Sequence, residues 1–229
     1  MVSFGEADAA RNFAASGGCA WVRICARFGN PGFLRRADMR YGGGMDQQLE
    51  EAITRFRQIA GAGPTYMALA TSTSDARPSV RTVMLAGIVD SAFAFFVNGN
   101  SGKGLQLQEN PWAGMCFHWP EQNAQVLVDG QVDVLDDETA DGLWHNRPRH
   151  TALLAWASFQ DAGDGLLGER LEQVRNTYAD ERIPRPAHWL GFALAPHRIE
   201  FWSGGWRHGR DRDSYVLEDG RWHRLSLNP

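Results

Sequence analysis

The chain has 229 residues, of which 43% are hydrophobic and 22% are charged, and its formal net charge is −4 at pH 7. A chain of this composition can bury one sizeable core, and it fits a single domain of the length expected for a barrel. The weak negative charge gives no electrostatic reason to expect nucleic acid or an anionic membrane as a partner. Local basic clusters are therefore expected to serve a small ligand.

Cysteine and histidine usage bears on metal binding and on the cellular compartment. Cys19, Cys25 and Cys116 show no CxxC spacing, and the histidines show no metal-ligand grouping. Neither a disulfide framework nor a metal site is supported. No apolar run approaches the roughly 20 residues of a membrane-spanning helix. We expect a soluble protein of the reducing cytoplasm, without a metal.

Residues 1–44 differ in character from the rest of the chain. They are rich in Gly, Ala and Arg without clear periodicity, and they end in the run YGGG directly before Met45. This pattern predicts a disordered arm, or an extension translated from an upstream start. A transit peptide is the alternative, because the segment carries Arg and few acids, but Glu6, Asp8 and Asp38 disfavour it. The folded domain is expected to be residues 45–229.

The first predicted elements after Met45 are a helix and three strands. Hydrophobic residues recur at spacings of three and four from Leu49 to Ile59, and Gly61 follows, which predicts an amphipathic helix that ends there. Turn-forming SDARP and VDS separate the next apolar runs, as in an antiparallel meander. The runs are TYMALATS, SVRTVMLAGIV and AFAFFVN.

The remainder alternates in character. A short helix (104–109) precedes the strand-like runs NPWAGMCFHW and AQVLVDGQVDVL. Two stretches with helical spacing follow, and Asp136 or Asp137 is placed to cap the first. Strands return in WLGFALAP, HRIEFW, SYVLEDG and RWHRLSL, with Asp219 and Gly220 forming a hairpin signal. About seven strands with one helical excursion predict a mainly β (α+β) fold, a small barrel with flanking helices.

Lys103 lies in the glycine-rich segment VNGNSGKG, which invites comparison with nucleotide motifs. No GxGxxG opens a helix after the first strand, and Val97 and Gly104 occupy positions where a P-loop needs Gly and Ser or Thr. What remains is a lysine in a turn that enters a helix, where backbone N–H groups favour a phosphate. An ordinary loop is the alternative interpretation.

Several blocks, taken in order, carry a resemblance. They are RPSVRTVML, FFVNGNSGKG, ENPWAGMCFHW, QVLVDGQV, HNRPR, AWASFQ and IEFWSGG followed by Asp211 and Arg212. Over residues 66–229 the chain resembles the pyridoxine (pyridoxamine) 5'-phosphate oxidase family, whose relationship extends to the flavin oxidases of phenazine biosynthesis. The resemblance implies an FMN-binding split β-barrel, and a homodimer that holds FMN at the subunit interface.

The resemblance also implies roles for particular residues. Arg81 and Lys103 would hold the FMN phosphate, while Phe96 and Val97 stand where the family has Tyr and Thr. The other implied cofactor positions are Thr82, Val83, Met84, Gln125, Gln160, Trp202 and Arg212. The competing interpretations are ordinary ones: Trp202 as a core aromatic, and Arg81 and Arg212 in exposed ion pairs.

The substrate positions match the family less well. Where the family grips a phosphate with Lys, Tyr, Arg and Ser, this chain has Ala86, Leu143, Arg147 and Thr151. The family also places an Arg and a His two residues apart over the substrate ring. Here the order is reversed, with His208 before Arg210, and these two are the implied catalytic residues.

The resemblance implies an FMN-dependent oxidase. A hydride would pass from a substrate carbon bearing an amine or alcohol to flavin N5, and dioxygen would reoxidise the flavin to give hydrogen peroxide. Pyridoxamine or pyridoxine 5'-phosphate is the first expected substrate. The alternatives are a phenazine-type or other ring substrate, and a split barrel that binds flavin without catalysis.

Overall fold

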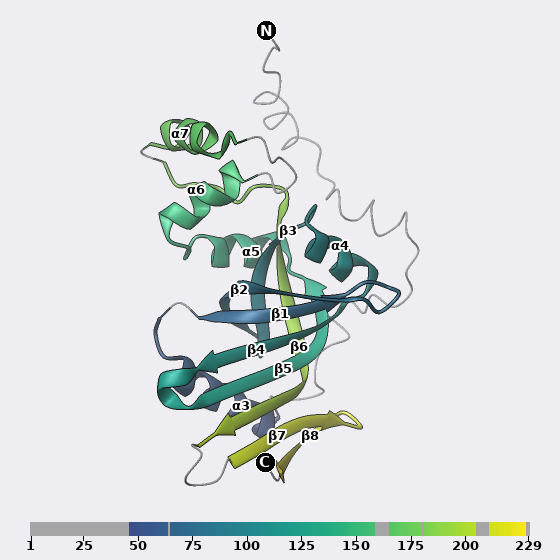
Figure 1. Ribbon diagram of the computed structural model, residues 1–229. Helices are drawn as coiled ribbons and strands as arrows, with labels where there is room; N and C mark the ends of the chain where they lie inside the picture. The colour runs from purple at the N-terminus through teal and green to yellow at the C-terminus, as the bar shows by residue number, and fades with distance from the viewer. Residues whose placement is uncertain (1–45, 64, 159–164, 180, 205–210, 228–229) are drawn as a thin grey trace. The chain divides into compact units, whose positions relative to one another are not determined.

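The computed structural model describes residues 46–63, 65–158, 165–179, 181–204 and 211–227. The chain divides into two compact units, Met1–Asp38 and Met39–Pro229, and every described residue belongs to the second. The arm predicted over residues 1–44 lies outside the described residues. Figure 1 traces the described elements along the chain.

In the described part of the chain, eight antiparallel strands form one sheet in the order β3-β2-β1-β4-β5-β6-β7-β8. β3 also pairs with β6, so the first six strands close on themselves, while β7 and β8 continue from β6 (Figure 1). This arrangement confirms the predicted split barrel. The strands are β1 (Tyr66–Ser72), β2 (Pro78–Val89), β3 (Ala92–Asn98), β4 (Trp112–Trp119), β5 (Ala124–Val134), β6 (Trp189–Ser203), β7 (Asp211–Glu218) and β8 (Arg221–Leu227).

The strand β6 is longer than the sequence pattern suggests, because the runs WLGFALAP and HRIEFW are continuous across Pro196. The pairing of β5 with β6 shifts register between Asp129 and Gly130, where Gly130 faces Pro196. A Cβ on Gly130 would lie 2.0 Å from the carbonyl oxygen of Ala195. A bulge with a glycine in it is where a strand tolerates proline. The close backbone approach at Gly130 thus allows β6 to continue through Pro196 as one strand.

Helix α3 (Gln47–Ala60) is the amphipathic helix predicted after Met45. Asp46 caps it by accepting a hydrogen bond of 2.9 Å from the backbone N–H of Gln48. Its buried face brings Phe56 edge-on to Phe93 and Phe117 of the barrel, with ring centroids 5.0 and 4.9 Å away. The helix also lies beside β7 and β8 (Figure 1). These edge-to-face contacts add to the hydrophobic burial that holds α3 on the barrel.

The other helices pack against different strands. α4 contacts β1 and β3, α5 contacts β2 and β6, and α6 packs on α7 (Figure 1). Asp136 caps α5, since its carboxylate accepts from the N–H of Thr139 at 2.7 Å. The long helical run predicted after Asp136 is divided at Pro148, which cannot continue a helix. The bounds are α4 (Gly102–Glu109), a 3-10 turn (Pro120–Gln122), α5 (Asp137–Trp144), α6 (Arg149–Ala157) and α7 (Leu167–Thr177).

Candidate functional site

The guanidinium of Arg81 is fixed where β1, β2 and α4 meet. Its Nη1 donates to the carbonyl oxygen of Leu69 at 3.2 Å and to Oγ1 of Thr71 at 2.6 Å, and its Nη2 donates to Oε1 of Gln106 at 3.3 Å. Gln106 is held in turn, because its Nε2 donates to Oγ of Ser79 at 3.0 Å. Hydrogen bonds that the guanidinium donates to one strand, β1, and to one helix, α4, therefore set the direction of this cation.

Lys103 occupies the first turn of α4. Its Nζ donates to Oγ of Ser101 at 3.3 Å, and the same oxygen caps the helix by accepting from the N–H of Gly104. A Cβ on Gly104 would lie 2.6 Å from the carbonyl oxygen of Asn98 and 2.7 Å from that of Gly99. Only glycine allows the helix to begin this close to the preceding turn. This close approach fixes the position of the first turn of α4, and with it the position of Lys103.

Arg81 and Lys103 repel each other. Burial lowers the pKa of both groups, and the positive charge of Arg81 lowers that of Lys103 further. Among the described residues, neither cation has a carboxylate partner. An anion would relieve this repulsion, and the N-terminus of α4 favours negative charge. The pair is therefore a candidate anion site, and the assignment of Arg81 and Lys103 to the FMN phosphate stays a prediction.

Gln125, Trp202 and Arg212 stand in one row across three strands. The register places Gln125 of β5 opposite Trp202 of β6, and Trp202 opposite Arg212 of β7. Residues directly opposite in a sheet lie on the same face. The guanidinium carbon of Arg212 lies 4.7 Å from the centroid of the Trp202 ring, which is a cation–π distance. The structure therefore brings together three residues that lie far apart in the sequence.

Glu200 connects the last two members of this row. Its Oε1 accepts from Nε of Arg212 at 3.0 Å and from Nε1 of Trp202 at 2.5 Å, and its Oε2 accepts from Nη2 of Arg212 at 3.1 Å. Burial alone would raise the pKa of this carboxyl, but the hydrogen bonds from Arg212 and Trp202 and the nearby charges lower it overall. Glu200 was not singled out from the sequence. The sequence does place Glu200 two residues before Trp202 on one strand, and residues with this spacing lie on the same face of a sheet.

Arg147 lies among three aromatic rings. Its guanidinium carbon is 5.1 Å from the ring centroid of Trp144, 5.4 Å from that of Phe96 and 5.5 Å from that of Trp189. Its buried Nε has no hydrogen-bond partner among the described residues, and burial lowers its pKa. A buried donor without a partner is costly unless a ligand or water satisfies it. Arg147 therefore has both the charge and the unsatisfied donor needed to bind an anionic group.

The other predicted substrate positions offer little polar chemistry. Ala86 and Leu143 pack against the hydrophobic cluster that contains Phe96 and Trp144, two of the aromatic neighbours of Arg147. The Leu143 side chain also lies over β2, with its Cδ2 3.3 Å from the place of a Cβ on Gly87. The hydroxyl of Thr151 donates to the carbonyl oxygen of Pro148 at 2.7 Å. Ala86 and Leu143 thus add apolar groups, and no hydrogen-bond donors, to the surroundings of Arg147.

The expected cofactor positions on β2 and β3 differ in exposure. Thr82 is exposed, Val83 is buried and Met84 is half-buried, as the alternation of a strand requires. Phe96 and Val97 are 4% and 0% exposed. Val97 therefore presents no surface to a cofactor, and Phe96 presents very little. Gln160, His208 and Arg210 lie outside the described residues.

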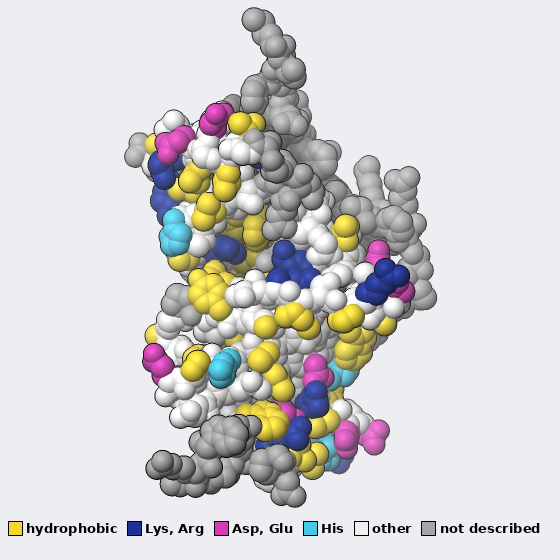
Figure 2. Space-filling model, viewed as in Figure 1, with side chains coloured by type: hydrophobic (Ala, Val, Ile, Leu, Met, Phe, Trp, Pro, Cys, Tyr) yellow, Lys and Arg dark blue, Asp and Glu magenta, His cyan; other side chains and the backbone are white. Residues whose placement is uncertain are grey.

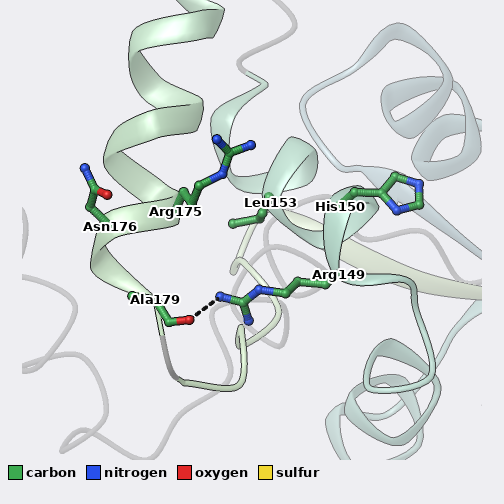
Figure 3. A pocket seen from close by; sticks show the side chains of 6 residues that line it. All are labelled: Arg149, His150, Leu153, Arg175, Asn176 and Ala179. Atoms are coloured by element: carbon green, nitrogen blue, oxygen red, sulfur yellow. Dashed lines mark hydrogen bonds between the residues drawn. The ribbon is translucent and has the colours of Figure 1, made fainter.

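A surface pocket lies between α6 and α7, and none of the residues that line it was predicted as a site residue. It is lined by Arg149, His150, Leu153, Arg175, Asn176 and Ala179 (Figure 3). Its cations already have partners: Arg149 donates to the carbonyl oxygen of Ala179 at 3.1 Å, and Arg175 pairs with Glu172 at 2.6 Å. The three basic side chains also point in different directions (Figure 3). This pocket is a weaker candidate than the clusters around Arg81 and Arg147.

The described residues offer neither a metal site nor a membrane-spanning helix. Among the described residues, no three His, Cys, Asp or Glu side chains stand together as metal ligands would. The helices described are all too short or too polar to cross a bilayer. On the face shown in Figure 2, Lys and Arg side chains form separate groups among hydrophobic and uncharged ones. What the described residues assemble is cations beside aromatic rings.

Solved structures of other proteins share this fold. The crystal structure of PhzG from Burkholderia lata 383, in complex with tetrahydrophenazine-1-carboxylic acid, matches with a TM-score of 0.69 and 26% identity, over 83% of this chain and 96% of that one. An FMN-binding protein from Nostoc punctiforme, described as related to pyridoxamine 5'-phosphate oxidase, matches with a TM-score of 0.65 and 19% identity. It covers 82% of this chain and 100% of its own, and at that identity it supports the fold alone.

Sequence comparison identifies the family. A protein of Synechocystis sp. named pyridoxine/pyridoxamine 5'-phosphate oxidase is 43% identical over 169 residues, which cover 72% of this chain and 79% of the relative. A protein of Alkalilimnicola ehrlichii with the same name is 40% identical over 198 residues, covering 80% of this chain and 100% of the relative. The family model described as pyridoxamine 5'-phosphate oxidase matches residues 49–202. The chain therefore belongs to the pyridoxamine 5'-phosphate oxidase family.

Proposed function

We propose that this protein is an FMN-dependent oxidase of a ring substrate that carries an anionic group. The observation that carries the proposal is the pair of Arg81, on β2 beside α4, and Lys103, in the first turn of α4. Among the described residues, neither cation has a carboxylate partner. A cation at a helix N-terminus with a second cation close by suits the phosphate of FMN. Family membership and the names of the relatives support the oxidase activity.

The remaining flavin contacts would come from the row across β5, β6 and β7. In this proposal Gln125 and Trp202 lie along the ring system, and Arg212 supplies a cation for the edge on which negative charge collects during reduction. Bound FMN would supply the redox chemistry, accepting a hydride from the substrate carbon and passing two electrons to dioxygen to give hydrogen peroxide. The residues of this chain bind and orient, and no strong nucleophile is required.

Arg147 would hold the anionic group of the substrate. Pyridoxamine or pyridoxine 5'-phosphate is the first candidate, because relatives at about 40% identity bear that name. A charge-assisted contact to phosphate contributes roughly 1.5–3 kcal/mol. Ala86 and Leu143 cannot donate such contacts, so the phosphate would depend mainly on Arg147 and would bind more weakly than in a site with four donors.

A second substrate class is favoured by the same surroundings. A ring carboxylate carries one negative charge and presents two oxygens in a plane, which a single guanidinium matches with two parallel hydrogen bonds. The aromatic rings around Arg147 and the apolar Ala86 and Leu143 suit an extended ring. PhzG, the structural match with tetrahydrophenazine-1-carboxylic acid, holds a ligand of this class. A flavin-binding protein without oxidase activity is the third alternative.

The proposal includes a homodimer. Val80 is 66% exposed and directly precedes Arg81, and Leu105 is 50% exposed and lies two residues after Lys103. Large exposed apolar side chains beside a binding site suggest a surface that another subunit covers. We expect the FMN-loaded protein to sediment as a dimer. A monomer that retains its flavin would contradict this expectation.

A comparison of substrates tests the proposed activity. The protein is loaded with FMN, and hydrogen peroxide release is measured with phosphorylated B6 vitamers, their unphosphorylated forms and a reduced phenazine carboxylate. A higher kcat/KM for a phosphorylated vitamer than for its unphosphorylated form supports the first substrate class, and turnover of the carboxylate alone supports the second. Flavin absorbance without peroxide from any substrate identifies a binding protein instead.

A further inference from the structure

We propose that Glu200 is a positioning residue that fixes Arg212 and Trp202 as one unit for flavin binding. The inference rests on the proposed function, because it concerns the same flavin site. It goes beyond that function by assigning a role to a buried acid that would not itself touch the ligand.

Glu200, Arg212 and Trp202 differ in their exposure to solvent, and this difference separates their roles. The side chain of Glu200 is 2% exposed, whereas that of Arg212 is 30% exposed, and Trp202 is half-buried. A ligand at this surface can therefore reach Arg212 and Trp202 but not Glu200. Any effect of Glu200 on a ligand must pass through the two residues that it holds.

The hydrogen bonds determine the orientation of the cation. Both carboxylate oxygens of Glu200 accept from Arg212, through Nε at 3.0 Å and Nη2 at 3.1 Å. A guanidinium held at two points by a carboxylate is fixed in plane as well as in position. Nη1 makes no hydrogen bond to the described residues and stays available. The pairing thus leaves one defined edge of Arg212 for a ligand.

The ring of Trp202 is fixed by the same carboxylate. Nε1 of Trp202 donates to Oε1 of Glu200, the oxygen that also accepts from Nε of Arg212. This shared acceptor holds the indole beneath the guanidinium, at the centroid distance of 4.7 Å. Without the carboxylate, both side chains would gain rotational freedom that a ligand would then have to remove.

The alternative is that Glu200 has a purely structural role and serves only to join β6 to β7. β6 and β7 are already joined by backbone pairing from Arg198 to Ser203, so the ion pair is not needed to bring the strands together. A comparable pair between strands, Arg198 with Asp129 at 2.7 Å, has side chains 46% and 40% exposed. Asp129 therefore provides a matched control, a carboxylate bonded to arginine across neighbouring strands but not joined to Trp202.

The experiment measures the Kd for FMN by titrating apoprotein and following the quenching of flavin fluorescence. The variants are Glu200→Gln, the double variant Glu200→Gln with Arg212→Met, and Asp129→Asn as the control. The double variant removes both charges, so it does not leave a buried ion without its partner, and its folding is checked by circular dichroism. The two Glu200 variants are expected to bind FMN at least tenfold more weakly than the wild type and within twofold of each other, and the control to bind it normally.

Two results would overturn the inference while leaving the proposed function intact. One is a wild-type Kd for Glu200→Gln. The other is a double variant that binds FMN tenfold more weakly than Glu200→Gln, because Arg212 would then act without Glu200. Failure of the wild-type protein to bind FMN would instead overturn the proposed function, and the inference with it.

Discussion

The positive charge of Arg81 lowers the pKa of Lys103, and no carboxylate of the described residues neutralises either group. Two cations held in mutual repulsion by a strand and a helix form a site that is less stable empty than filled. A dianionic phosphate would satisfy both, which is why this pair is central to the proposed FMN site.

Replacing either cation should weaken FMN binding. Arg81→Ala or Lys103→Ala removes a charged donor from the phosphate, which costs about 2 kcal/mol, or roughly 30-fold in Kd. Arg77→Ala is the matched control, because Arg77 lies near the start of the same strand with its side chain 83% exposed and paired with Asp75. Fluorescence titration with FMN measures all three. Unchanged affinity in both site variants would remove the phosphate assignment.

The lowered pKa of Lys103 predicts a dependence of FMN binding on pH. The phosphate needs the protonated ammonium, and this lysine loses its proton at a lower pH than an ordinary lysine does because of burial and Arg81. FMN affinity should therefore decline as the pH rises into the alkaline range. Lys103→Arg keeps its charge there and should flatten the decline. Parallel Kd curves against pH for the two proteins would show that Lys103 is not the group responsible.

Arg147 should matter for the substrate rather than for flavin. Arg147→Ala is expected to lower kcat/KM far more than it lowers FMN affinity, because in the proposed function Arg147 binds the anionic group of the substrate. Ala86→Lys should improve the KM for a phosphorylated vitamer by adding an ammonium donor. Arg175→Ala, an exposed arginine paired with Glu172, should change neither value. Equal losses of flavin and substrate affinity in Arg147→Ala would contradict the division of roles.

Two glycines allow a test of the fold. Gly130→Ala places a Cβ 2.0 Å from the Ala195 carbonyl oxygen, and relieving that clash should lower the free energy of unfolding by about 1–3 kcal/mol or more. Gly142 in α5 has no atom within 4 Å of the same place. Gly142→Ala should instead stabilise by roughly 0.5–1 kcal/mol through helix propensity. Denaturant unfolding measures both, and a stable Gly130→Ala protein would argue against the bulge.

Local patterns in the sequence were sufficient for several elements. The periodicity from Leu49 to Ile59 predicted α3, and Asp219 and Gly220 predicted the last hairpin, where both adopt the positive φ that such turns need. The continuity of β6 was not predictable in this way. It depends on Gly130 of a neighbouring strand, which no pattern around Pro196 reveals.

The candidate site, too, was only partly predictable from the sequence. The blocks around Arg81, Lys103 and Trp202 could be selected by resemblance, but their surroundings depend on contacts distant in sequence. The rings around Arg147 come from β3, α5 and β6. The hydrogen bonds that Arg212 donates to Glu200 depend on the register of β6 with β7, which places Arg212 opposite Trp202, two residues from Glu200. Only the folded chain shows these relationships.

The most direct test of the oxidase proposal is an anaerobic mixing experiment. FMN-loaded protein is combined with pyridoxamine 5'-phosphate without oxygen, and the visible absorbance of the flavin is followed; air is then admitted and hydrogen peroxide is measured. The proposal predicts bleaching of the absorbance, its recovery in air and one peroxide for each flavin reoxidised. A flavin that stays oxidised with this substrate, with pyridoxine 5'-phosphate and with a reduced phenazine carboxylate would contradict it.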